Sequence, residues 1–349
     1  LNEPSNNSPD QCEEPIVNLV LVAVLGTDVV LVCTTEPFLY LHGTITQRSD
    51  APSQSSNNLY QGHLIACNNF ITIMPDYLGL GDDTTQMHPY HHASSTLTAT
   101  IDMIRASETF LGTEYSIDMD TNLYITGFSQ GGYATMIAHK GIQEEYDSEY
   151  TVTASFPSSG AYDLSGTMLD LALTSTEPMI DTDDTFGDQL GIYYFPYVLL
   201  TMNSIYTLYD DINSVFIESL SSVGSYYDMV TDEDTINNFI NTNLDNNGLS
   251  ENLIQDIFQD SYLSAVLDDD SHDLRVALEY NDAYKWIPET KMVIISCDGD
   301  NIVPSANATV AYNYMIDNGA GNNIVSLEML SADSHNACFA QSIDQIYLN

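Results

Sequence analysis

Short, mostly apolar runs, each followed by a turn and a helical pattern, constrain the fold of this chain most. The runs at 70–74 (FITIM), 123–126 (LYIT) and 291–297 (KMVIISC) are continuous rather than alternating in hydrophobicity. Strands of this kind are typical of parallel sheets that are buried on both faces. Because parallel strands need a crossover connection, usually a helix, the repeated strand–turn–helix order predicts a doubly wound α/β domain.

The same alternation predicts how the chain is divided. A helix is expected over 93–111 and a strand over 152–156, after which Tyr-, Asp- and Asn-rich segments interrupt the pattern until about residue 285. We therefore predict a polar N-terminal tail at 1–15. An α/β core is expected over 16–163 and 286–349, and an insertion over 164–285. Two β-rich runs within 16–33 additionally predict an antiparallel hairpin.

A G-x-S-x-G motif, Gly127-Phe128-Ser129-Gln130-Gly131, lies between the β-run at 123–126 and a helical pattern. This is the position of a nucleophile elbow. The flanking glycines permit a tight turn that projects the Ser129 hydroxyl and keeps other side chains away from it. The motif predicts Ser129 as a nucleophile; the alternative is a glycine-rich turn in which Ser129 only caps the helix.

A serine nucleophile needs a base within hydrogen-bond reach and a carboxylate that orients the base. In hydrolases with this elbow the chain order is Ser, acid, His. Of the histidines after Ser129, His139 lies on the helix of the elbow and His272 in the insertion, whereas His335 follows the last expected strand. His335 is therefore the predicted base.

Two aspartates, Asp298 and Asp300, follow the strand that ends at Cys297. Asp300 is preferred as the acid because it begins the segment DNIVP, which resembles the D-x-x-V-P that often carries the acid in α/β-hydrolases. Asp298 remains the alternative. Asp333 is too close to His335 in sequence for the usual geometry.

Stabilisation of an oxyanion requires two fixed N–H donors. One is expected to be the backbone N–H of Gln130, directly after the nucleophile. The other is expected to be the N–H of Thr44, because His42-Gly43-Thr44 follows an apolar strand and resembles an HG-x oxyanion loop.

An aromatic cluster in the insertion is a candidate wall of the substrate pocket, since such pockets are largely apolar. An equally good interpretation is that these residues form the core of the insertion. Tyr77 is a further candidate, although a structural role in its turn is favoured, and His91 and His92 are interpreted as ordinary helix-start residues. The cluster comprises Tyr193, Tyr194, Phe195 and Tyr197, with Tyr206 and Tyr209 nearby.

The charge of the chain excludes one class of partner. There are 50 acidic and 6 basic residues, giving a formal net charge of -44. Such a field repels phosphates, so a nucleic-acid partner is not expected. The acidic excess is consistent either with adaptation to high salt or with solubility alone.

The cysteines, the apolar runs and the start of the chain bear on the cellular location of the protein. The five cysteines show no metal-site spacing and leave at least one thiol unpaired within the chain. No apolar run of about 18 residues is present, so no stable membrane insertion is expected. The polar start of the chain, LNEPSNNSPDQCEE, is typical of a processed, secreted protein.

The chain resembles secreted bacterial α/β-hydrolases related to the secretory lipase family. The matching stretches are LHGT (41–44), MPDYLGLGDD (74–83), HPYHHASSTLTATIDMIRA (88–106), YITGFSQGGYATMIAHK (124–140), SGAYDLSGTM (159–168) and DGDNIVP (298–304). The resemblance implies an α/β-hydrolase fold with a helical cap or lid inserted after the sixth strand. It also implies ester hydrolysis without a metal or cofactor, in an extracellular or periplasmic location.

Taken together, the motifs predict a serine esterase or lipase that acts on a small-molecule or lipid ester, with short or medium acyl chains favoured. The alternatives are a serine peptidase or acyltransferase on the same fold, because the catalytic residues do not select the leaving group. A non-catalytic binding protein is less favoured, because Ser, Asp and His all occur in the expected order. The oligomeric state does not follow from the sequence.

The two interpretations of the acidic excess differ in their prediction for salt. If the charge reflects adaptation to high salt, screening of self-repulsion will raise the melting temperature steadily with NaCl. Thermal unfolding in NaCl from low to molar concentration measures this. A melting temperature that hardly changes would leave solubility as the explanation.

Overall fold

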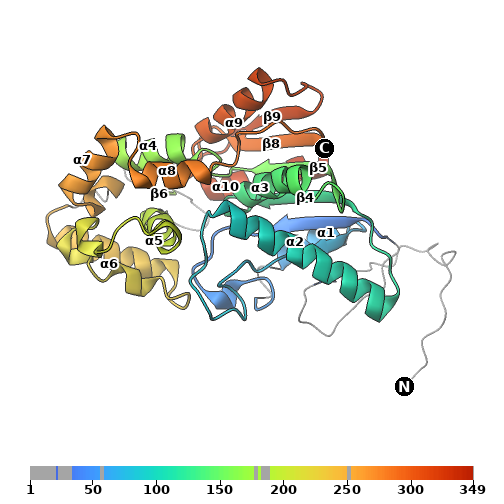
Figure 1. Cartoon of the computed structure of the whole chain (residues 1–349), viewed down its shortest axis with the longest axis horizontal. Helices are drawn as coiled ribbons and strands as arrows, with labels where there is room; N and C mark the ends of the chain where they lie inside the picture. Colours follow the sequence, from blue (N-terminus) through green and yellow to red (C-terminus); the bar gives the residue numbers. More distant parts are fainter. Residues whose placement is uncertain are drawn as a thin grey trace.

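A single parallel sheet forms the centre of the protein (Figure 1). The computed structural model describes residues 21–22, 34–55, 59–176, 180–181, 189–249 and 253–348. Every strand pair in the sheet is parallel, which confirms the predicted α/β class. In spatial order the strands are β1 (Leu21–Val22), β3 (Ile71–Ile73), β2 (Pro37–Leu41), β4 (Asn122–Phe128), β5 (Thr151–Ser158), β8 (Lys291–Cys297) and β9 (Val325–Leu330).

Helices cover both faces of the sheet, because successive strand side chains point to opposite sides and both sets are apolar. On one face, Leu39, Ile125 and Ile294 belong to the main core. On the other face, Phe38, Tyr40 and neighbouring side chains form a smaller cluster. The first face packs against α2 (Ala93–Phe110), α3 (Gln130–Glu145) and α9 (Ala306–Asp317), and the second against α1 (Tyr60–Ala66) and α10 (His335–Leu348).

The segment between β5 and β8 contributes a separate group of helices, which gather at one end of the sheet (Figure 1). A two-stranded antiparallel pair, β6 (Ile180–Asp181) with β7 (Gln189–Leu190), belongs to the same segment. A π-helical turn, Leu164–Met168, precedes the first of these helices. The helices are α4 (Leu169–Thr174), α5 (Tyr194–Tyr206), α6 (Glu233–Asn246), α7 (Asp260–Asp268) and α8 (Asp273–Tyr280).

The N-terminal predictions fall largely outside the described residues. The polar tail at 1–15 and most of the hairpin at 16–33 are not described. The described part of that hairpin, β1, pairs in parallel with β3. Within the described ranges, no helix is both long enough and apolar enough to cross a membrane.

Helix α3 carries a histidine that is fully enclosed between the helix and the sheet. The ring nitrogens of His139 lie 2.8 Å from Ser155 Oγ and 2.9 Å from Thr290 Oγ1. Burial disfavours the charged imidazolium and lowers the pKa of His139 from 6.5 to about 3. The unfolded chain binds this proton below pH 6.5, but the folded chain does not until the pH approaches 3. The free energy of unfolding must therefore fall as the pH is lowered through this window.

Replacing this histidine removes its part of the pH dependence. His139→Gln will lower the free energy of unfolding near pH 7. The difference from wild type will shrink by about 1.4 kcal/mol per pH unit between pH 6 and 4. Urea denaturation of both proteins at several pH values measures it. Carboxylates titrate alike in the two chains and cancel, so parallel pH curves would contradict this assignment.

Candidate active site

The turn at Ser129 has the backbone geometry of a nucleophile elbow. Ser129 connects β4 to α3 with φ 59° and ψ −120°, a conformation that non-glycine residues rarely adopt. Its N–H donates to the carbonyl oxygen of Ser158, at the end of β5 (3.0 Å). The turn is therefore fixed on the neighbouring strand.

The two flanking glycines are required by close backbone contacts. A Cβ atom on Gly131 would lie 1.9 Å from the carbonyl oxygen of Leu41, at the end of β2. A Cβ atom on Gly127 would lie 2.4 Å from the same oxygen and 2.4 Å from the Gly131 oxygen. Both positions of the G-x-S-x-G motif must be glycine because α3 and β4 lie so close to β2 that no side chain fits there.

Asp300 and His335 are in direct contact. The His335 Nδ1–H donates to Asp300 Oδ2 over 2.7 Å, and both side chains are buried. The second Asp300 oxygen, Oδ1, accepts the backbone N–H groups of Ile302 (3.1 Å) and Val303 (2.9 Å). The carboxylate is thereby fixed in orientation. The alternative acid, Asp298, is exposed to solvent.

Phe128 links this pair to the elbow. Its ring centroid lies 4.6 Å from that of His335, and Phe128 immediately precedes Ser129. The base and the serine thus belong to adjoining segments, although 206 positions separate Ser129 and His335 in the sequence.

The loop at 42–48 lies beside the nucleophile. A Cβ atom on Gly43 would be 3.5 Å from the Phe128 carbonyl oxygen and 4.0 Å from Ser129 Cβ. The Thr44 hydroxyl is hydrogen-bonded to the Tyr90 hydroxyl over 2.7 Å. The loop that contains Thr44 is therefore adjacent to the elbow, and its position is fixed by the bond to Tyr90.

The side chain of Gln130 is bound by a histidine that the sequence analysis did not select. The His88 Nδ1–H donates to the carbonyl oxygen of Leu78 (2.9 Å), so its Nε2 accepts from Gln130 Nε2 (2.6 Å). Burial lowers the pKa of His88 from 6.5 to about 3, which keeps Nε2 free of a proton near neutral pH. The sequence feature that could have pointed to His88 is the segment HPYHH at 88–92, in which three histidines precede a helix.

The segment between β5 and β8, which corresponds to the predicted insertion, is joined to the 42–48 loop by several hydrogen bonds. The Arg48 backbone N–H and guanidinium donate to the carbonyl oxygens of Met229 and Asp228, each over 2.9 Å. The Gln47 amide donates to the Val230 carbonyl oxygen (2.6 Å). These bonds fix this part of the insertion on the loop beside Ser129.

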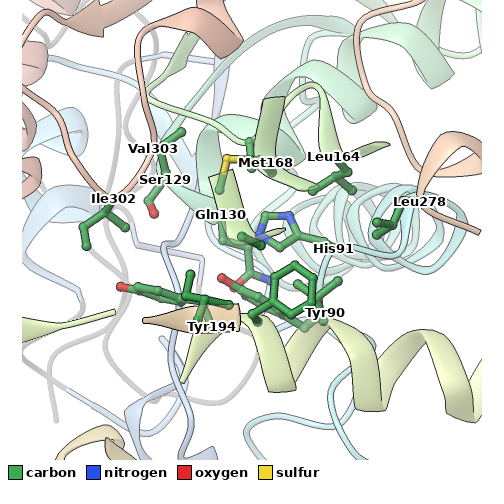
Figure 2. Close-up of a pocket in the computed structure, with 15 residues that line it drawn as sticks. Tyr90, His91, Ser129, Gln130, Leu164, Met168, Tyr194, Leu278, Ile302 and Val303 are labelled. Atoms are coloured by element: carbon green, nitrogen blue, oxygen red, sulfur yellow. The ribbon is translucent and has the colours of Figure 1, made fainter. Parts of the chain in front are cut away.

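A mostly apolar cavity of about 60 Å³ is lined by Ser129 and by residues of α5, among others. Figure 2 shows Ser129 beside Ile302 and Val303, with Leu278 toward the other end of the cavity. The lining residues are Tyr90, His91, Ser129, Gln130, Ala161, Leu164, Met168, Ala172, Tyr194, Phe195, Val198, Ile254, Leu278, Ile302 and Val303.

The five predicted pocket residues have different positions. Tyr194 and Phe195 line the cavity. Tyr197 is fully buried and stacks on Tyr90, with ring centroids 4.3 Å apart, and the Tyr193 carbonyl oxygen accepts the Tyr227 hydroxyl (2.6 Å).

Tyr77 does not line the cavity either. Its hydroxyl donates to the carbonyl oxygen of His42 (3.3 Å). Tyr77, Tyr193 and Tyr197 are therefore buried outside the lining of this cavity. His91, interpreted from sequence as a helix-start residue, instead lines the cavity. Among the described side chains, no group of three His, Cys, Asp or Glu is arranged to hold a metal ion.

Comparison with known families identifies the group to which the chain belongs. The family model described as secretory lipase matches residues 63–343. The chain belongs to the secretory lipase family. This membership supports a hydrolase of the lipase or esterase class, as the resemblance implied. No curated protein is significantly similar to this chain.

Solved structures confirm the α/β-hydrolase fold. A protein from Legionella pneumophila is 22% identical, with a TM-score of 0.74 over 90% of this chain and 80% of that chain. The rice cell wall degrading esterase LipA from Xanthomonas oryzae is 23% identical, with a TM-score of 0.73 over 90% and 81%. Candida antarctica lipase A in its closed state is 11% identical, with a TM-score of 0.58 over 89% and 71%.

The close contact at Gly131 predicts a large effect of one added methyl group. Gly131→Ala will lower the free energy of unfolding by about 3 kcal/mol, because the Leu41 carbonyl oxygen is backbone and cannot move alone. Urea denaturation measures the change. As a control, Gly112→Ala adds a methyl group whose nearest neighbour, the Ile117 oxygen, is 4.0 Å away, and stability should not fall. Equal stability of Gly131→Ala and wild type would contradict the packing described here.

Proposed function

We propose that this protein is a serine carboxylic-ester hydrolase in which Ser129, His335 and Asp300 form a catalytic triad. The observation that carries the proposal is the buried 2.7 Å contact of His335 Nδ1 with Asp300, made beside the strained turn at Ser129. Because Nδ1–H donates to the carboxylate, Nε2 is the nitrogen available to accept the serine proton.

In the proposed reaction, Ser129 Oγ attacks the ester carbonyl carbon while His335 takes the serine proton. The backbone N–H groups of Gln130 and Thr44 stabilise the oxyanion. His335 then returns its proton to the alkoxide leaving group, and an acyl-enzyme remains. Water, activated by His335, attacks the acyl-enzyme and releases the acid.

The neutral state of His88 has a role in this arrangement. Gln130 is the residue whose backbone N–H must point at the oxyanion, and its side chain is tied to His88 Nε2. The bond requires an unprotonated acceptor, which burial of His88 provides. His88 therefore supports the position of Gln130 without contacting the substrate.

Short and medium acyl chains fit the site best. The cavity at Ser129 is apolar and small, with a volume of about 60 Å³. Each methylene group buried there contributes about 0.8 kcal/mol until the cavity is filled. Beyond that length, further methylenes gain nothing or require the wall to move. We propose that the helices of the insertion act as a cap that closes this acyl site.

An extracellular or periplasmic location is part of the proposal. The family is described as secretory, and a disulfide joins Cys297 to Cys338. Disulfides persist mainly in oxidising compartments. Cys67 is a free thiol, and Cys12 and Cys33 lie outside the described residues.

The decisive experiment compares wild type with Ser129→Ala on p-nitrophenyl esters from acetate to palmitate. We expect kcat to fall by at least about 10⁴-fold in the variant, with an unchanged fold by circular dichroism. We also expect the wild-type rate to be greatest for short or medium chains. Ser221→Ala, which alters an exposed serine of the insertion, serves as the matched control.

Two results would contradict the proposal. Retained turnover in Ser129→Ala would exclude this serine as the nucleophile. A wild-type protein without activity at every chain length, in low and high salt, would favour a peptidase or a binding protein. Anilide substrates with the same acyl groups would then test for peptidase activity.

A further inference from the structure

The Cys297–Cys338 disulfide is placed symmetrically about the acid and the base. Cys297 is the last residue of β8 and lies three positions before Asp300. Cys338 lies in the first turn of α10, three positions after His335. The two Cα atoms are 5.8 Å apart. The covalent bond thus joins the two segments whose side chains make the 2.7 Å contact.

The disulfide is part of a small buried cluster that reaches the nucleophile as well. Both cysteines are fully buried and pack with Phe128 and Ala332. Phe128 precedes Ser129, and its ring lies 5.2 Å from the ring of Phe339, the residue after Cys338. This cluster therefore contacts the chain next to Ser129, Asp300 and His335.

The disulfide is a direct link between the start of α10 and the end of β8. Among the described residues, the Asp298 N–H donates to Leu330 and the Gly299 N–H to Ala332, so the acid loop is bonded to the end of β9. Residues 331–334 then lead to His335. A path through these residues allows more displacement than a direct covalent bond.

We propose that the Cys297–Cys338 disulfide is a positioning element that holds His335 at hydrogen-bond distance from Asp300. The inference rests on the proposed function. Catalytic groups must be held to within a fraction of an ångström, and a misplacement of about 1 Å can cost about 100-fold in rate. Loss of the disulfide should therefore lower kcat by about 10- to 100-fold. KM should change little, because neither cysteine lines the substrate cavity.

The first test replaces both cysteines. The Cys297→Ala/Cys338→Ala variant is assayed with the best p-nitrophenyl ester of the wild type, well below the melting temperature of each protein. We expect kcat to fall by about 10- to 100-fold and KM to stay within about threefold. Cys67→Ala, which removes the exposed free thiol, is the matched control and should leave both constants unchanged.

The second test keeps Cys297 and Cys338 and changes the oxidation state of their bond; the double variant, treated in the same way, controls for the other cysteines. Cys67→Ala protein is reduced with dithiothreitol in guanidinium chloride and refolded with the reductant present. The reduced protein should show the low kcat of the double variant. Glutathione disulfide should then restore the higher kcat. In this reaction the two thiols lose two electrons and two protons, and two molecules of reduced glutathione form. The double variant should not respond. If the double variant fails to fold, the comparison of kcat between reduced and reoxidised Cys67→Ala protein tests the positioning role.

The outcomes separate three cases. A fall in kcat with a steady KM, reversed by oxidation, supports a positioning role. A lower melting temperature with unchanged kcat overturns it and leaves the disulfide as a stabiliser of the fold. Wild-type protein without Ser129-dependent ester hydrolysis overturns the proposed function itself, and this inference with it.

Discussion

The close approach of three strand ends at Ser129 is the constraint on which the rest of the site depends. The Leu41 carbonyl oxygen of β2 leaves no room for a side chain at Gly127 or Gly131, and the Ser158 oxygen of β5 accepts the Ser129 N–H. These contacts hold the serine in a conformation that a free turn would not adopt. Parallel strands make this possible, because their carboxyl ends meet at one edge of the sheet.

Near this turn, two buried histidines are neutral. His88 and His91 both have a pKa lowered to about 3 by burial, so their rings act as hydrogen-bonding and packing groups rather than charges. This is consistent with a chain whose many acidic residues belong mostly to its surface. The insertion takes part in the support, since its residues at 228–230 are bonded to the 42–48 loop.

The sequence predicted those parts of the site that depend on local geometry. The elbow at Ser129 follows from two glycines between a strand and a helix. Asp300, preferred over Asp298 from the sequence, contacts His335 in the structure, whereas Asp298 is exposed; its role as the acid stays a prediction. The boundaries of the α2 helix were predicted to within one residue, because the apolar spacing at 93–111 has the helical period.

Contacts between distant residues that no sequence motif marks were not predicted. Tyr194 and Phe195 line the cavity while Tyr193 and Tyr197 do not, because the packing of α5 against Tyr90 decides which side of the helix faces the cavity. The bond between Gln130 and His88, and the pairing of Cys297 with Cys338, join residues that are 42 and 41 positions apart. The sequence by itself determined the fold class and the candidate nucleophile, because periodicity and glycine sterics are local properties, and the chain order of hydrolases with this elbow supplied the candidate acid and base. Only the tertiary structure decided the cavity wall and the supporting bonds, because these depend on how separate segments pack.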